Sequence, residues 1–352
     1  MSTRVEQNRF SRGPRAGGPA GTPPREPGGH RETRAGQRAY PGAFPIGPTI
    51  SFLRRLRASL DAGSELPQSL AEAAGALPRD LRDALDRMVH RLAGDYAEDE
   101  WGFDEEFADS LLPFFEFLYD RWWRVQAIGT RNVPSHGRTL IVANHAGVVP
   151  WDATMMSVAM LREHPLPRYA RFLVLDWAFT LPWVSVAMRK LGGVVASPYN
   201  ALRLLEQDEL VAVFPEGAKG AGKGFGQRYR LQRFGRGGFV EIALRTGSPI
   251  VPVAVVGSEE IYPKVADASL VARAIGAPYF PITPTFPALG PLGVIPLPSK
   301  WRIEFCEPIP TAQFGPEAAE DRSFVFELSE RIRETIQSKV YDNLVARGSA
   351  FI

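Results

Sequence analysis

The feature that most constrains the fold of this chain is a pair of short apolar runs, each of which breaks into a polar turn. Residues 140–143 lead directly to Asn144 and His145, and residues 210–214 lead to Glu216. Short runs that are rich in β-branched residues and flanked by Gly and Pro are typical of the inner strands of an α/β sheet. Because ligands of such sheets gather outside the strand ends, the two turns are expected to share one crevice.

The side chains in these turns indicate acid–base chemistry. His145 is followed by Asp152, and a neutral imidazole oriented by a carboxylate is what base-assisted attack by a hydroxyl requires. We therefore predict that His145 and Asp152 form a catalytic pair. Neither a metal ion nor a covalent nucleophile is needed for this chemistry.

Three motifs occur in a fixed order along the chain. They are Asn144-His145 with the later Asp152, then Phe214-Pro215-Glu216-Gly217, then the apolar run 249–257. In this order they resemble the motifs of the glycerol-phosphate and lysophospholipid acyltransferase superfamily, over roughly residues 111–340. The resemblance implies an α/β fold in which a mixed sheet is flanked by helices.

The resemblance also implies a reaction. An O-acyltransferase of this kind moves a fatty acyl group from acyl-CoA or acyl-carrier protein to a hydroxyl of a glycerolipid or lysophospholipid. His145 would be the general base, Asp152 would orient it, and Glu216 would accept hydrogen bonds from acceptor hydroxyls. Backbone N–H groups near Gly147 or Gly217 would face the oxyanion, and no cofactor is expected beyond the acyl donor.

A basic segment follows the second motif. It holds six cations within 18 residues, from Lys219 to Arg236. Such a segment suits the phosphates of coenzyme A or of a lipid headgroup, although a solvated surface loop would look the same. The residues predicted to contact substrate are Asn144, Gly147, Phe214, Pro215, Glu216, Gly217, Lys219, Arg228, Arg230 and Arg236.

Two departures from the family pattern leave alternatives open. His145 and Asp152 are separated by six residues instead of four, so the loop between them must bulge, and a non-catalytic lipid-binding protein of the same fold is one alternative. Near Ser197 the family usually presents an Arg that grips the acceptor phosphate, and an uncharged residue disfavours a phosphate acceptor. A remote alternative is a P-loop NTPase, because residues 217–223 have that spacing, but Gly224 replaces the expected Ser or Thr.

Composition divides the chain into three parts. Residues 1–48 contain eight Arg, three Glu and no Lys, so this stretch carries +5 while the rest of the chain carries −3 within a total of +2. Its Gly, Pro and Arg content predicts a disordered tail, solvated or attracted to anionic lipid. A helical region is predicted for residues 49–110, with helices at 49–60 and 77–92, and the acyltransferase domain for residues 111–345.

Several weak signals favour peripheral membrane association in the cytoplasm. The single Cys306 favours a reducing compartment, and nucleic acid is not an expected partner. Residues 274–299 lack any charge but contain seven prolines, which excludes a membrane-spanning helix and predicts an extended apolar loop. This loop either covers the core or touches the bilayer through Phe280, Phe286, Leu289, Leu292 and Ile295. The aromatic segment 111–124 places rings beside basic residues, as interface anchors do, but an aromatic stripe at helical spacing is more often part of the core, and core burial is the favoured interpretation.

Overall fold

The computed structural model describes residues 46–79, 81–82, 85, 98–145, 149–181, 184–274, 276 and 280–351. All of them belong to one compact unit, Pro45–Ile352. Most of the predicted tail, residues 1–45, lies outside the described residues, as do Gly147 and most of the helix predicted at 77–92.

A seven-stranded mixed sheet forms the centre of the protein, in the order β1-β9-β6-β2-β5-β3-β4. Every neighbouring pair is parallel except β6 and β9, which run antiparallel. The strands are β1 Gln126–Ile128, β2 Thr139–Ala143, β3 Ala170–Val174, β4 Gly193–Val195, β5 Leu210–Val213, β6 Ile250–Val256 and β9 Arg302–Phe305. The predicted mixed α/β sheet is therefore confirmed.

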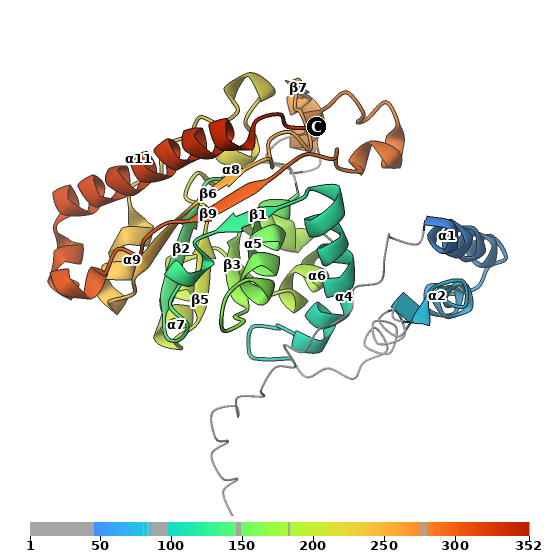
Figure 1. Ribbon diagram of the computed structural model, residues 1–352, viewed down its shortest axis with the longest axis horizontal. Helices are drawn as coiled ribbons and strands as arrows, with labels where there is room; N and C mark the ends of the chain where they lie inside the picture. The colour runs from blue at the N-terminus through green and yellow to red at the C-terminus, as the bar shows by residue number, and fades with distance from the viewer. Residues whose placement is uncertain are drawn as a thin grey trace, which may run out of the picture. The chain divides into compact units, whose positions relative to one another are not determined.

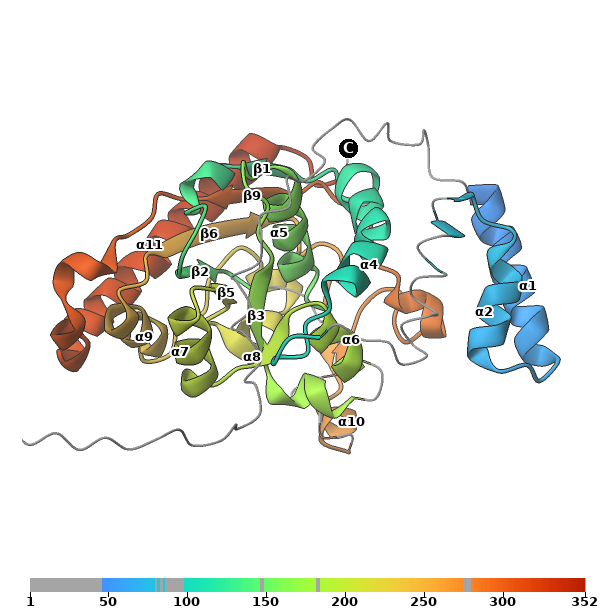
Figure 2. The ribbon, with the colours of Figure 1, turned by 90° about the horizontal axis from the view of Figure 1, so that it is seen from below.

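Helices cover both faces of this sheet, as the side-chain alternation of the strands requires. In β2, Ile141 and Ala143 join the core beneath α4 and α5, while Leu140 and Val142 join the core beneath α7, α9 and α11 (Figures 1 and 2). The helices are α4 Glu105–Phe117, α5 Trp151–Arg162, α6 Val184–Lys190, α7 Pro198–Glu206, α8 Gly217–Ala221, α9 Gly238–Thr246 and α11 Arg322–Arg347.

The helical region before the sheet differs from the prediction in its details. The first helix, α1, spans Ile46–Asp61, close to the predicted 49–60, and it packs against a second helix, α2 Leu66–Ala74, which was not predicted. The predicted domain boundary at residue 111 falls inside α4, because the side chain of Asp104 caps this helix by accepting the N–H of Phe107 at 3.0 Å.

The aromatic segment 111–124 belongs mainly to the core. After α4 the chain continues as a π-helical turn, Leu118–Trp122, in which Tyr119 is buried, and Trp123 beyond it is also fully buried. The ring of Trp123 stacks on that of Trp301 with centroids 4.9 Å apart. The favoured interpretation of this segment as core is thus confirmed for Tyr119 and Trp123.

A long excursion separates β6 from β9. It holds β7 Ala266–Asp267, α10 Ser269–Ala274, β8 Pro281–Ile282 and the 3-10 turn η5 Gly290–Val294. Among the described residues, no helix has both the length and the apolar character needed to cross a bilayer.

Candidate active site

The site forms where β2 and β5 end, because these strands are parallel neighbours and their carboxyl ends meet at one edge. His145 follows β2, and Asp152 lies in the first turn of α5 with no exposed surface. The Nδ1 atom of His145 lies 2.7 Å from Oδ2 of Asp152. The six-residue spacing therefore still brings the carboxylate to the imidazole, since the start of α5 turns Asp152 inward.

The contact with Asp152 defines which nitrogen of His145 can act as a base. With the proton on Nδ1 donated to the carboxylate, the lone pair is on Nε2. Burial by itself lowers the pKa of His145, but the charge and hydrogen bond of Asp152, with the charge of Glu216, outweigh it. The net effect is a pKa above the ordinary histidine value, so the ring takes up a proton readily.

Asn144 connects the turn after β2, which carries His145, to the neighbouring strand β6. Its side-chain nitrogen donates to the carbonyl of Val255 at 2.8 Å, and its side-chain oxygen accepts the N–H of Val255 at 2.7 Å. The carboxamide thus continues the pairing of β2 with β6 by one residue. The structure gives Asn144 a role in holding His145 in place, and its predicted contact with substrate stays a prediction.

Glu216 lies behind His145 and is almost completely buried. One of its oxygens accepts the main-chain N–H of His145 at 2.9 Å, and the other accepts the N–H of Gln232 at 2.6 Å. The carboxylate therefore ties together three turns, including its own. The predicted role of Glu216 toward acceptor hydroxyls stays a prediction. Its structural role is to hold the main chain at His145 and Gln232.

Lys223 is the residue of this site that sequence reasoning misread. It was counted among the cations for a phosphate ligand, yet its side chain is 4% exposed and lies between two carboxylates. Its Nζ atom is 3.3 Å from Oε2 of Glu216 and 2.9 Å from Oε1 of Glu259. No sequence pattern marks this contact, because Glu259 lies on the turn after β6 and only the sheet brings it near.

Gly220 shows how closely the two turns approach each other. A Cβ atom at this position would lie 2.6 Å from the Cβ of Glu216 and 3.1 Å from the carbonyl oxygen of His145. Only glycine lets α8 pass this near to the turn after β2 that carries His145. Its sequence signal was weak, since a glycine in a glycine-rich stretch does not stand out.

The other predicted residues divide into two groups. The ring of Phe214 packs on the imidazole of His145 with centroids 4.5 Å apart, and the half-buried Pro215 follows it. The N–H of Gly217 donates to the carbonyl of Phe214 at 2.9 Å, so it is not aimed at an oxyanion. The remaining predicted cations are exposed, and of these Arg230 contacts the buried charges only through its carbonyl, which accepts from Nζ of Lys223 at 3.3 Å: Lys219, Arg228, Arg230 and Arg236.

The position near Ser197, where the family usually has an Arg, is used to start a helix. Ser197 precedes α7, and its hydroxyl accepts the N–H of Asn200 at 3.0 Å as an N-cap. A hydroxyl engaged in this way offers no positive charge to a phosphate.

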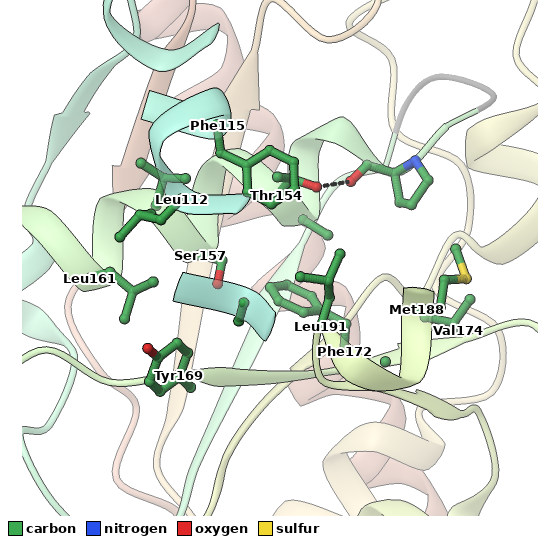
Figure 3. Close-up of a pocket in the computed structure, with 15 residues that line it drawn as sticks. Leu112, Phe115, Thr154, Ser157, Leu161, Tyr169, Phe172, Val174, Met188 and Leu191 are labelled. Carbon is green, nitrogen blue, oxygen red and sulfur yellow. Dashed lines mark hydrogen bonds between the residues drawn. The ribbon is translucent and has the colours of Figure 1, made fainter. Parts of the chain in front are cut away.

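An apolar pocket of about 110 Å³ runs along α5, beginning at Pro150 and Ala153 on either side of Asp152 (Figure 3). Helices α4 and α6 and strand β3 close it, with Leu112, Phe172 and Met188 pointing into the space (Figure 3). Its polar side chains are few, and Thr154 is bonded to the carbonyl of Pro150 at 3.3 Å. A pocket of this kind suits a hydrocarbon ligand.

Comparisons with known proteins identify a family and several relatives. A family model described as Acyltransferase matches residues 124–256, from just before β1 to the end of β6. An uncharacterized protein of Mycobacterium tuberculosis is 49% identical over 299 residues, covering 85% of this chain and 82% of that protein. An uncharacterized protein of Mycobacterium leprae is 51% identical over 289 residues, covering 82% and 76%.

Two further matches are more distant. Phytyl ester synthase 2 of Arabidopsis thaliana is 28% identical over 144 residues, which is 39% of this chain and 20% of that protein. The solved structure of a 1-acyl-sn-glycerophosphate acyltransferase from Thermotoga maritima has 21% identity and a TM-score of 0.44, covering 86% of this chain and 96% of that one.

Proposed function

The chain belongs to the acyltransferase superfamily, and from this premise we propose that it transfers a fatty acyl group from a thioester donor to a hydroxyl of a lipid. The donor is acyl-CoA or acyl-carrier protein, and the acceptor is a glycerolipid or lysophospholipid. The observation that carries the proposal is the pair of His145 and Asp152, whose side chains meet at 2.7 Å, while Pro150 and Ala153 close to Asp152 in the chain line the apolar pocket.

His145 acts as the general base in this reaction. Its Nε2 atom takes the proton of the acceptor hydroxyl while the oxygen attacks the thioester carbonyl, giving a tetrahedral intermediate. The carbon–sulfur bond then breaks, and the imidazolium gives its proton to the leaving thiolate. Asp152 stabilises the imidazolium between proton uptake from the hydroxyl and proton donation to the thiolate. The negative charge of this carboxylate is therefore needed for the reaction, and a neutral group of the same shape cannot replace it.

The apolar pocket holds the acyl chain. It lies along α5 from Pro150 to Leu161, so a chain inside it would extend away from Asp152 over several turns of the helix. A neutral acceptor is favoured over a phosphate, because Ser197 is an N-cap and not a cation. The name of the Arabidopsis relative, phytyl ester synthase, states ester formation, which agrees with transfer to oxygen.

The two alternatives from the sequence are less well supported. The non-catalytic alternative rested on the longer spacing between His145 and Asp152, but the pair is in direct contact. The NTPase alternative needs Lys223 at a phosphate, whereas this lysine is buried between Glu216 and Glu259.

The test is a thioester-release assay with the purified full-length protein. Acyl-CoA and acyl-carrier protein are each offered with lysophospholipids, monoacylglycerol and diacylglycerol. Acceptor-dependent thiol release should fall by about 10² to 10⁴ in His145→Ala, because the base is lost. The matched control is His136→Ala, at an exposed position before β2, which should behave as wild type.

Two results of this assay would contradict the proposal. If no acceptor stimulates thiol release from either donor, or if His145→Ala retains full activity with an unchanged fold, acyl transfer by this site is excluded. A circular dichroism melt of each variant separates loss of the base from loss of the fold.

A further inference from the structure

Four large aliphatic side chains are exposed within seven residues of the excursion between β6 and β9. Leu289, Leu292, Val294 and Ile295 are 57%, 67%, 49% and 54% exposed, and together they surround the 3-10 turn η5. We call residues 289–295 the apolar turn. Single exposed aliphatics are common on soluble proteins, but a cluster on one turn marks an interaction site.

The apolar turn is held rigidly from behind. The hydroxyl of Tyr262 donates to the carbonyl of Val294 at 2.7 Å, and the indole N–H of Trp122 donates to the carbonyl of Pro296 at 3.0 Å. Gly293 is buried so tightly that a Cβ atom would lie 2.4 Å from the carbonyl oxygen of Thr285. A turn fixed in this way cannot fold its aliphatic side chains back onto the protein, so their contact with water persists.

The same hydrogen bonds join the apolar turn to the candidate active site. Tyr262 also accepts the indole N–H of Trp151 at 3.2 Å, and Trp151 is the residue before Asp152. Pro150, on the other side of Trp151, lines the apolar pocket. The exposed aliphatics are therefore two hydrogen bonds away from the start of α5. A surface that contacts the apolar turn is therefore linked through Tyr262 to the first residue of α5, which precedes Asp152.

Charge indicates what that surface is. The 26 residues 274–299 carry no charge and so do not themselves repel an anionic lipid, and Asp267, which precedes them, is paired with Lys264. The basic segment meets the root of the excursion, since the N–H of Phe225 donates to the carbonyl of Lys264 at 2.9 Å, and Nζ of Lys264 donates to the carbonyl of Gly222 at 2.8 Å. Arg228 and Arg230, beside this junction, are exposed. An excursion with exposed aliphatic side chains and with exposed arginines at its root suits the surface of an anionic bilayer.

We propose that the apolar turn inserts into the surface of an anionic lipid bilayer and holds the α5 end of the site against it. This inference rests on the proposed function, since a lipid acceptor and a fatty acyl donor reach the site from such a surface. Trp122 and Tyr262 lie at the base of the turn with their polar atoms bonded inward, an arrangement that leaves only hydrocarbon to face the lipid.

The experiment measures co-sedimentation of the full-length protein with phosphatidylcholine vesicles, with and without phosphatidylglycerol. Leu292→Ser and Ile295→Ser, each at an exposed position, should each lower vesicle affinity by about tenfold. The matched control is Val345→Ser, because Val345 is 83% exposed on α11 and should leave binding unchanged. Wild-type binding should be stronger on the anionic vesicles and should weaken with salt.

Activity separates failure of the docking inference from failure of the proposed function. A double variant that combines Leu292→Ser with Ile295→Ser should retain thiol release from a soluble short-chain donor and lose it with vesicle-borne acceptor. If no donor gives thiol release but Leu292→Ser still weakens vesicle binding, acyl transfer fails and docking stands. If the variants bind vesicles as wild type does, or if they only convert a dimer into a monomer in sedimentation velocity, docking is overturned.

Discussion

Two buried carboxylates flank His145, and they act on different parts of it. Asp152 contacts the imidazole ring at 2.7 Å, whereas Glu216 accepts the main-chain N–H of the same residue at 2.9 Å. Asp152 therefore controls the tautomer and charge of the ring, and Glu216 controls where the residue lies. Glu216 also has a buried counter-ion in Lys223, as expected for a carboxylate that fixes structure.

Asp152→Asn should have the largest effect on activity. The amide cannot stabilise an imidazolium, so kcat/KM should fall by roughly 10² to 10⁴. In the wild type the pKa of His145 is raised, so activity should rise with pH through a value above the ordinary histidine pKa. Without the carboxylate this acid limb should move to lower pH. A pH–rate profile beside Asp342→Asn, an exposed control on α11, checks both effects.

Glu216→Gln should mainly lower the free energy of unfolding, and its loss of activity should be smaller than that of Asp152→Asn. The amide can still accept one N–H, but Lys223 loses one of its two counter-charges, which costs about 3 kcal/mol of unfolding free energy. Guanidinium unfolding beside Glu241→Gln, an exposed residue paired with Arg245, measures the difference. A stable Glu216→Gln that is as inactive as Asp152→Asn would show that the two carboxylates do not divide the work in this way.

Lys223→Met should move the acid limb of the pH–rate profile in the direction opposite to that expected for Asp152→Asn. Lys223 lowers the pKa of His145, while Glu216 raises it, so removal of the lysine should move the acid limb upward. The variant leaves Glu216 and Glu259 buried without their cation and should lose about 3 kcal/mol, part of which Glu259→Gln should restore. Lys339→Met removes a more exposed ion pair to Glu304 and should cost less than about 1 kcal/mol. An unshifted acid limb in Lys223→Met would contradict this account.

Ser157→Phe should have the smallest effect on the chemistry itself. Ser157 lines the pocket on α5, one turn beyond Ala153, so a ring there fills space without touching His145 or Asp152. Turnover of a short-chain donor should persist, while kcat/KM for a long-chain donor falls by about tenfold or more. Competition between two donor lengths measures the ratio directly, and an unchanged ratio would mean that the acyl chain lies elsewhere.

The local patterns of the sequence predicted what local physics decides. The runs 140–143 and 210–214 became β2 and β5, and the turns after them do meet at one edge of the sheet. Helix α2 was missed although its signal was present, since Pro67 lies in its first turn and small residues follow at helical spacing. The aromatic segment at 111–124 left core and interface both open, with core favoured, because core and interface aromatics have the same spacing; the burial of Tyr119 and Trp123 decided for the core.

The sequence by itself determined that the protein has an α/β sheet with His145 and Glu216 in the turns after two inner strands, because periodicity and turn residues act over a few neighbours. The tertiary structure decided that Lys223 is a buried counter-ion and that Asn144 bonds to Val255, 111 residues away. It also decided that Leu289, Leu292, Val294 and Ile295 stay exposed while Trp123 is buried. These outcomes depend on which strands become neighbours, since burial changes both the charge balance and the hydration of a side chain, and no local pattern encodes that.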